Sequence, residues 1–292
     1  MHKLKTTLLP RLLVCWLALG AAAHHACRAA GFRDTAGRDR VVCHSDAARE
    51  IVLLTFGQSI AANHGEAAYT PHGNVINFNA NDGNCYVATD PMLGATANND
   101  SHVGSIWGYL CDDLLATKKW DRCIVAPIAQ GSTSIADWAP AGAVGHLIRE
   151  AVEGLRANGL VPSAMLFGQG ETDASIAADP AAYEAHFNDM VADIRSFSAA
   201  PILVAVETIC YHDSIDLMDT DDGTRVLKWI GQEKIQQAQR AVVDLARGVL
   251  PGPDLDFIDS SVGRWDGCHL SSYGLKAAAD QWKYYVLQAM TH

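Results

Sequence analysis

The sequence predicts one α/β domain in three layers, with helices on both faces of a central, mainly parallel sheet of five strands. Apolar runs rich in β-branched residues alternate with longer segments whose apolar residues recur at helical spacing. The chain has 292 residues, enough for one large core, and no repeat or linker divides residues 30–292. Its 49% hydrophobic and 19% charged residues are ordinary for a globular domain.

The expected strands are continuous apolar runs, which is typical of strands buried on both faces of a parallel sheet. They span residues 51–56, 123–129, 164–167, 202–206 and 255–258. Pro127 lies inside the second run. Because proline has no N–H to donate, it is expected to weaken that strand or to place it near an edge of the sheet.

Apolar stripes at helical spacing predict helices around residues 144–155, 183–194, 235–245 and 275–286. Strands that alternate with helices in this way form parallel sheets covered on both faces. In such sheets, ligands bind outside the carboxyl ends of the strands. Functional residues are therefore expected in the loops that directly follow the strands.

Residues 1–29 have the pattern of a secretory signal peptide. Lys3 and Lys5 precede a short apolar run at 12–19, and small residues follow at 21–23. The run is too short to span a bilayer comfortably, so we expect a secreted or periplasmic protein without membrane insertion once the signal is removed. An uncleaved N-terminal anchor is the alternative interpretation.

The formal net charge of −11 argues against nucleic acid and anionic membranes as the main partners. It does not select a substrate, and nothing in the sequence selects an oligomeric state. There is no H-E-x-x-H or C-x-x-C motif, so neither a metal nor another cofactor is expected.

Six of the eight cysteines lie outside the signal segment, and an even number in an oxidising compartment predicts three disulfides. We expect a local bridge between Cys111 and Cys123. A bridge between Cys210 and Cys268 would brace the loop that carries His269. The alternative is six buried free thiols.

Ser59 follows the first strand in the turn Gly57-Gln58-Ser59, a suitable place for an exposed nucleophilic hydroxyl. Residue 61 is alanine, so the G-x-S-x-G elbow is absent, and a serine that caps a helix explains the position equally well. The long Asn- and Gly-rich stretch from 63 to 100 is expected to form a lid or wall beside Ser59.

Three further loops contain groups suited to acyl transfer. Gly131 follows the second strand, where its N–H could approach a ligand, and Gln169 follows the third, where its amide could donate to an oxyanion. In Asp266-Gly267-Cys268-His269, the carboxylate can hold the far nitrogen of the imidazole. A polar loop, a capped turn and a structural histidine are the alternatives for these loops taken singly.

Together these residues predict a serine hydrolase site with a nucleophile, a base and an acid that orients the base. Ser59 is the expected nucleophile, His269 the base and Asp266 the orienting acid. The backbone N–H groups of Ser59 and Gly131 and the side chain of Gln169 are the expected oxyanion donors.

The order of these blocks resembles the SGNH hydrolase superfamily and, within it, the sialic-acid acetylesterase and acetylxylan-esterase-like group of carbohydrate esterases. The matching blocks are G-Q-S at 57–59, G-S-T-S-I-x-x-W at 131–138, Q-G-E at 169–171 and D-G-x-H-L at 266–270. The resemblance implies an SGNH/flavodoxin-like fold and removal of acetyl groups from sialic acid, xylan or a similar sugar. An acetylated carbohydrate or another small ester is thus the expected partner.

Three positions depart from the group pattern: Ile60 replaces an asparagine, Ser132 replaces a second glycine, and Gly168 replaces a histidine. None removes a reacting group, but all three positions shape the pocket. Trp107, Trp138 and Trp265 lie near the loops and could stack on sugar rings.

Other functions use the same residues differently. An acetyltransferase would pass the acyl group to a sugar instead of water, and a decayed hydrolase would only bind carbohydrate. Glu171 and Asp173 form a possible acid pair for glycoside hydrolysis, although they lie two residues apart on one loop.

Overall fold

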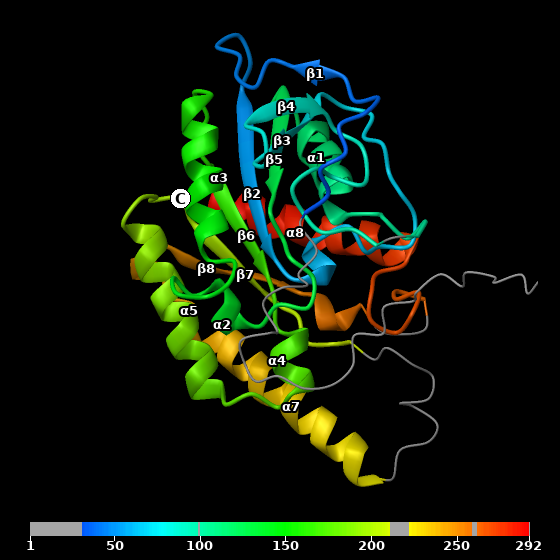
Figure 1. The fold of residues 1–292 in the computed structure, drawn as a ribbon, viewed down its shortest axis with the longest axis vertical. Helices are drawn as coiled ribbons and strands as arrows, with labels where there is room; N and C mark the ends of the chain where they lie inside the picture. The colour runs from blue at the N-terminus through cyan, green and yellow to red at the C-terminus, as the bar shows by residue number, and fades with distance from the viewer. Residues whose placement is uncertain (1–30, 99, 211–221, 259–261, 292) are drawn as a thin grey trace, which may run out of the picture.

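The computed structural model describes residues 31–98, 100–210, 222–258 and 262–291, without the side chains of 222–231. The predicted signal peptide therefore lies outside the described residues. The described chain forms a three-layer α/β/α domain (Figure 1), which confirms the predicted fold class.

The sheet has eight strands within the described residues, in the order β1-β4-β3-β5-β2-β6-β7-β8. The six strands from β3 to β8 in this order run parallel, and β4 and β1 continue the sheet antiparallel beyond β3. Their bounds are β1 Arg40–Val41, β2 Glu50–Gly57, β3 Val75–Asn79, β4 Asn84–Val87, β5 Arg122–Pro127, β6 Ala164–Gly168, β7 Ile202–Val206 and β8 Val249–Asp254.

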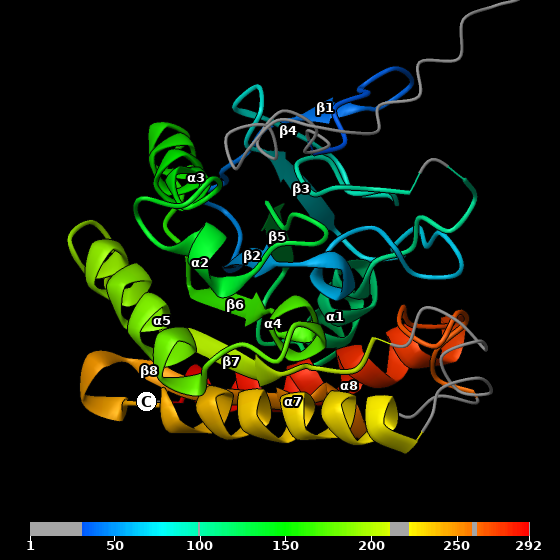
Figure 2. The same cartoon turned by 60° about the horizontal axis from the view of Figure 1, so that its bottom comes forward.

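Helices cover both faces of this sheet, and Figure 2 shows α3 and α5 to one side of it and α1 to the other. Their bounds are α1 Ile106–Ala116, α2 Ile135–Trp138, α3 His146–Ala157, α4 Glu171–Ser175, α5 Pro180–Arg195, α7 Asp222–Ala241 and α8 Ser272–Ala289. Short 3₁₀ helices are η2 Ser59–Ala61, η3 Leu245–Arg247 and η4 Leu255–Phe257.

Successive residues of β2 point to opposite faces, as the pleat of a strand requires. Val52, Leu54 and Phe56 join the core beneath α2, α3, α5 and α7. Ile51 and Leu53 join the second core beneath α1 and α8. The continuous apolar run of β2 thus reflects burial on both faces.

The structure corrects three details of the sequence prediction. The described residues form eight strands rather than five, because the stretch from 63 to 100 contains β3 and β4 and the short β1 precedes β2. Strand β5 lies in the middle of the sheet, not near its edge. Pro127 is tolerated there because it is the last residue of the strand, and Ile128 N–H donates to Thr55 O directly after it (2.9 Å).

The third correction concerns the last strand, which was expected at 255–258. Residues 255–257 form η4, whose first turn is capped by the Asp254 side chain, and the strand lies just before them as β8. Pro251 and Pro253 interrupt its apolar pattern. They are compatible with a strand there because β8 is the last strand of the sheet and pairs only with β7.

Three disulfides join Cys43 to Cys85, Cys111 to Cys123 and Cys210 to Cys268. The last two were expected. The Cys111–Cys123 bridge ties α1 to β5, and the Cys210–Cys268 bridge ties the chain after β7 to the loop of His269. Among the described residues, no helix combines the length and apolar character that crossing a bilayer requires.

Candidate active site

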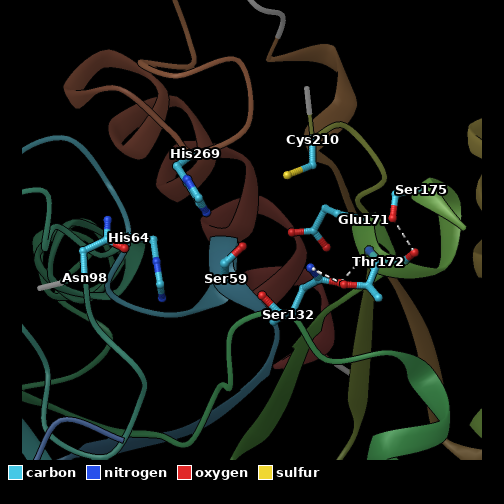
Figure 3. A pocket seen from close by; sticks show the side chains of 10 residues that line it. Ser59, His64, Asn98, Ser132, Glu171, Thr172, Ser175, Cys210 and His269 are labelled. Carbon is cyan, nitrogen blue, oxygen red and sulfur yellow. Dashed lines mark hydrogen bonds between the residues drawn. The ribbon is translucent and has the colours of Figure 1, made fainter. Parts of the chain in front are cut away.

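Loops from the carboxyl ends of β2, β5, β6 and β7 line one pocket together with the loop before α8 (Figure 3). This is the edge at which ligands of parallel sheets bind. The lining residues are Gln58, Ser59, His64, Asn98, Ser132, Glu171, Thr172, Ser175, Cys210 and His269. Ser59 and His269, predicted from opposite ends of the chain, thus share a pocket.

Ser59 is positioned by a sharp turn at the end of β2. Gly57 has a φ of 131°, and a Cβ atom there would lie 1.7 Å from Gly168 O, so only glycine fits between the two strands. Gln58 N–H then donates to Gly168 O (2.9 Å), and Ser59 begins η2. The Ser59 N–H has no acceptor among the described residues, which is typical of the first turn of a helix.

His269 is held by Asp266, with 2.7 Å between Nδ1 and Asp266 Oδ2. The other carboxylate oxygen accepts the N–H groups of Cys268 (2.8 Å) and His269 (2.6 Å). Burial alone would raise the pKa of Asp266, but the bond and charge of His269 and these two donors outweigh it and lower the pKa to about 2. An ionised Asp266 only accepts, so Nδ1 carries a proton, and Figure 3 shows the ring extending toward Ser59.

Two other rings stack on the His269 ring and restrict how it can turn. The centroid of His64 lies 5.2 Å from that of His269, and the centroid of Trp265 lies 6.1 Å from it. Trp265 also stacks on His102 and donates its indole N–H to His64 O (3.2 Å). No motif surrounds His64, so the sequence does not indicate its place in the pocket.

His64 is a second imidazole in the pocket, but its protonation differs from that of an ordinary histidine. Burial, and then the neighbouring His269, lower its pKa to about 4. Its Nε2 lies 3.3 Å from Thr96 Oγ1. His64 is therefore neutral at physiological pH.

Gly131, an expected oxyanion donor, does not line the pocket, and its N–H donates to Thr96 Oγ1 (2.9 Å). The next residue, Ser132, lines it instead, with a φ of 60°. This left-handed region favours glycine, the residue that the resembling group usually has there. The departure at 132 thus places a hydroxyl in the pocket at a cost in backbone strain.

Gln169, whose side chain was the third expected donor, is fully buried and lies behind the pocket lining. Its Nε2 atom lies within hydrogen-bond distance of Gln58 Oε1 (3.2 Å), Thr133 O (3.1 Å) and Asp173 Oδ2 (2.5 Å). This arrangement differs from the expected one, in which the amide faces the substrate. In the structure, Gln169 braces Gln58, which does line the pocket.

A buried pair of carboxyl groups forms another part of the site. Glu171 lines the pocket, and its carboxyl interacts with that of Glu207, which is also buried. Burial, and then the charge of Glu207, raise the pKa of Glu171 well above its usual range, and burial also raises the pKa of Glu207. The two carboxyls therefore hold a proton between them.

The structure separates the acids of the possible glycosidase pair. Glu171 faces the pocket, whereas Asp173 lies outside its lining and accepts the N–H of Ile135 (2.9 Å) and the Gln169 amide. No common space for a sugar lies between the two. Among the described residues, no group of three or more His, Cys, Asp or Glu side chains is placed to hold a metal ion.

The three candidate tryptophans and the stretch from 63 to 100 lie only partly at the pocket. Trp107 and Trp138 are fully buried core residues, while Trp265 is half-buried beside His269. The stretch from 63 to 100 contributes His64 and Asn98 to the pocket, but its middle forms β3 and β4. Only its two ends are a wall beside Ser59.

Comparisons with known proteins agree with this architecture. A family model described as "Carbohydrate esterase, sialic acid-specific acetylesterase" matches residues 50–247. A solved structure of an Arabidopsis thaliana protein is 15% identical, covers 82% of this chain and 98% of its own, and has a TM-score of 0.61. The structure of NanS is 14% identical, covers 83% and 98%, and has a TM-score of 0.54. At these identities the two structures show a shared fold. No curated protein matched the sequence.

Proposed function

We propose that this protein removes acetyl groups from carbohydrates through an acyl-serine intermediate on Ser59. The chain belongs to the carbohydrate esterase family of sialic acid-specific acetylesterases and is therefore a carboxylic ester hydrolase. The proposal depends mainly on one observation: Asp266 Oδ2 lies 2.7 Å from His269 Nδ1, and the His269 ring extends toward Ser59.

In the proposed reaction, Ser59 Oγ attacks the acetyl carbonyl while His269 Nε2 takes its proton. Asp266 stays ionised and stabilises the imidazolium that forms. His269 then returns the proton to the departing sugar oxygen. A water molecule, deprotonated by the same nitrogen, attacks the acyl-serine, releases acetate and restores Ser59.

The oxyanion of each tetrahedral intermediate needs hydrogen-bond donors at the start of η2. The Ser59 N–H is the first donor that we propose, since it has no acceptor among the described residues. The Gly131 N–H is a second, provided that it exchanges the Thr96 hydroxyl for the oxyanion. Gln169 contributes only if its amide leaves one of its three present partners.

We further propose that the protein is exported and that residues 1–29 are removed. Three disulfides support an oxidising compartment, because such bonds are rare in reducing ones.

The test is hydrolysis of p-nitrophenyl acetate and of an acetylated sugar by the purified protein and its Ser59→Ala variant. We expect Ser59→Ala to lower kcat/KM by at least about 10⁴-fold, because the nucleophile is lost while substrate binding persists. Ser196→Ala, an exposed serine at the end of α5, is the matched control and should leave the rate unchanged. Comparable rates for Ser59→Ala and wild type would reject the proposal.

A further inference from the structure

The pocket around Ser59 is lined mainly by groups that are polar and uncharged. Hydroxyl and amide side chains of Gln58, Asn98, Ser132, Thr172 and Ser175 surround the nucleophile. Among the described residues, no Lys or Arg belongs to the lining. Such groups suit the hydroxyls of a sugar, whereas a carboxylate is typically recognised by a guanidinium or an ammonium group.

Arg264 is a cation close to the site in sequence, but its guanidinium is not available to a ligand. It is 3% exposed and donates to the backbone carbonyls of Leu255, Ile258, Ile209 and Cys268. It also lies 3.9 Å from Asp256, which offsets its charge. Arg264 therefore holds the loop of His269 in place from behind.

The pocket could still bind an anion through a protonated histidine, and His64 is the candidate beside His269. Its Nε2 is already engaged with Thr96 Oγ1, and burial lowers its pKa to about 4. The groups that face it are His269, Asn98, Thr96, Asp266 and Asp100, and the positive charge of a protonated His269 opposes a second cation. His64 thus supplies no positive charge at neutral pH.

Charges of the opposite sign are close to the same space. Asp266 is ionised behind His269, and the Glu171–Glu207 pair can lose its proton but cannot become positive. An anionic substrate would leave water for a site whose described residues repel it and include no lysine or arginine to pair with it.

From this absence of a cation in the described lining, we infer that the substrate is an acetyl ester of an uncharged sugar, and that the site discriminates against acetylated sialate or uronate. The inference rests on the proposed function and narrows it. It differs from the specificity in the description of the family model, because the described lining holds no lysine or arginine to pair with the sialic acid carboxylate.

The test compares pairs of acetyl esters in which one member carries a carboxylate and the other an uncharged group at the same carbon. One pair is the methyl glycoside of 9-O-acetyl-N-acetylneuraminic acid and its methyl ester. The other is methyl 2-O-acetyl-glucopyranosiduronate and methyl 2-O-acetyl-glucopyranoside. Released acetate is measured at pH 7 and low salt, and we expect kcat/KM to be at least tenfold higher for the neutral member of each pair. Equal or faster hydrolysis of the free acids would overturn the inference.

Two controls keep this result separate from the proposed function. Turnover of p-nitrophenyl acetate by wild type, and its loss in Ser59→Ala, tests the esterase alone. If no ester is hydrolysed, the proposed function fails and the inference fails with it.

A designed variant tests the electrostatic cause. Ser175 is an exposed residue at the rim, so Ser175→Lys adds a cation and Ser175→Gln adds a neutral side chain. We expect the lysine variant to narrow the neutral-to-anionic ratio at least threefold relative to the glutamine variant, with the difference reduced at high salt. An unchanged ratio in both variants would show that charge does not determine the preference.

Discussion

Asp266 and Glu171 are two carboxylic acids at one pocket, and their surroundings give them opposite protonation. Asp266 accepts two backbone N–H groups and the Nδ1 proton of His269. Glu171 accepts its neighbour's backbone N–H at 3.1 Å and otherwise faces the carboxyl of Glu207. Burial raises the pKa of both acids, but only Asp266 has enough donors to reverse that effect.

The difference shows that proximity to Ser59 does not decide which acid supports the base. An acid that stabilises an imidazolium must stay ionised when the histidine is protonated, and only the donors around Asp266 ensure this. Glu171 is better suited to donate or accept a hydrogen bond as a neutral acid. Replacing each carboxyl by an amide, in Asp266→Asn and Glu171→Gln, can therefore distinguish the ionised acid that supports the base from the neutral acid that forms hydrogen bonds.

The largest expected effect is on catalysis. Asp266→Asn should lower kcat/KM by about 10⁴-fold, because an amide neither stabilises the imidazolium nor enforces the Nδ1–H tautomer. Glu171→Gln should cost at most about tenfold, because a glutamine retains a donor toward Glu207. The measurement is steady-state hydrolysis of p-nitrophenyl acetate, with circular dichroism to verify folding. A larger loss in Glu171→Gln than in Asp266→Asn would reverse the assignment.

The two acids also differ in how far the sequence predicts them. Asp266 and His269 are three residues apart with Gly267 between them, so their pairing is local and can be recognised. Glu171 and Glu207 come from the ends of β6 and β7, and their contact depends on the pairing of those strands. No spacing along the chain indicates it.

The strength of the local sequence signal also distinguishes the other features that were predicted correctly from those that were not. Buried strands such as β2 have a strong apolar signal, whereas β8, with two prolines, has a weak one. The Cys210–Cys268 bridge was expected because it would brace the loop that carries His269. His64 reaches the pocket through a long loop, and the buried position of the Gln169 amide follows from tertiary contacts that the Q-G-E block does not encode.

The second effect concerns stability at neutral and alkaline pH. The raised pKa values of Glu171 and Glu207 mean that the folded state keeps a proton that the unfolded state loses above about pH 4.5. Stability should therefore fall as pH rises from about 4.5 toward and beyond 7, by on the order of 3 kcal/mol for a shift of Glu207 to about 7.

Glu171→Gln should remove the part of this slope that Glu171 contributes, leave the part that burial of Glu207 causes, and be more stable than wild type at pH 8, because residue 171 no longer has to retain a proton. Urea unfolding at pH 5, 6, 7 and 8 measures the effect. Asp266→Asn is the comparison, since its acid is ionised throughout this range and should leave the slope unchanged. A wild-type stability that is constant from pH 5 to 8 would contradict a shared proton.

The smallest expected effect is a loss of stability in acid, where stability falls as pH decreases. The pKa of Asp266 is lowered from an ordinary 3.8 to about 2, so its contribution to stability is present above about pH 4 and is lost as pH falls toward 2. Because Asp266 is half-buried and solvent screens its charge, we expect about 1 kcal/mol. Asp266→Asn should lose this contribution at pH 6 but match wild type at pH 2, in urea unfolding at both values.

Asp121→Asn is the matched control. Arg49 lowers the pKa of Asp121 to about 2 on the surface, so this substitution should change stability in acid without changing activity. If Asp266→Asn and wild type differ equally at both pH values, packing rather than ionisation distinguishes Asp266 from Glu171.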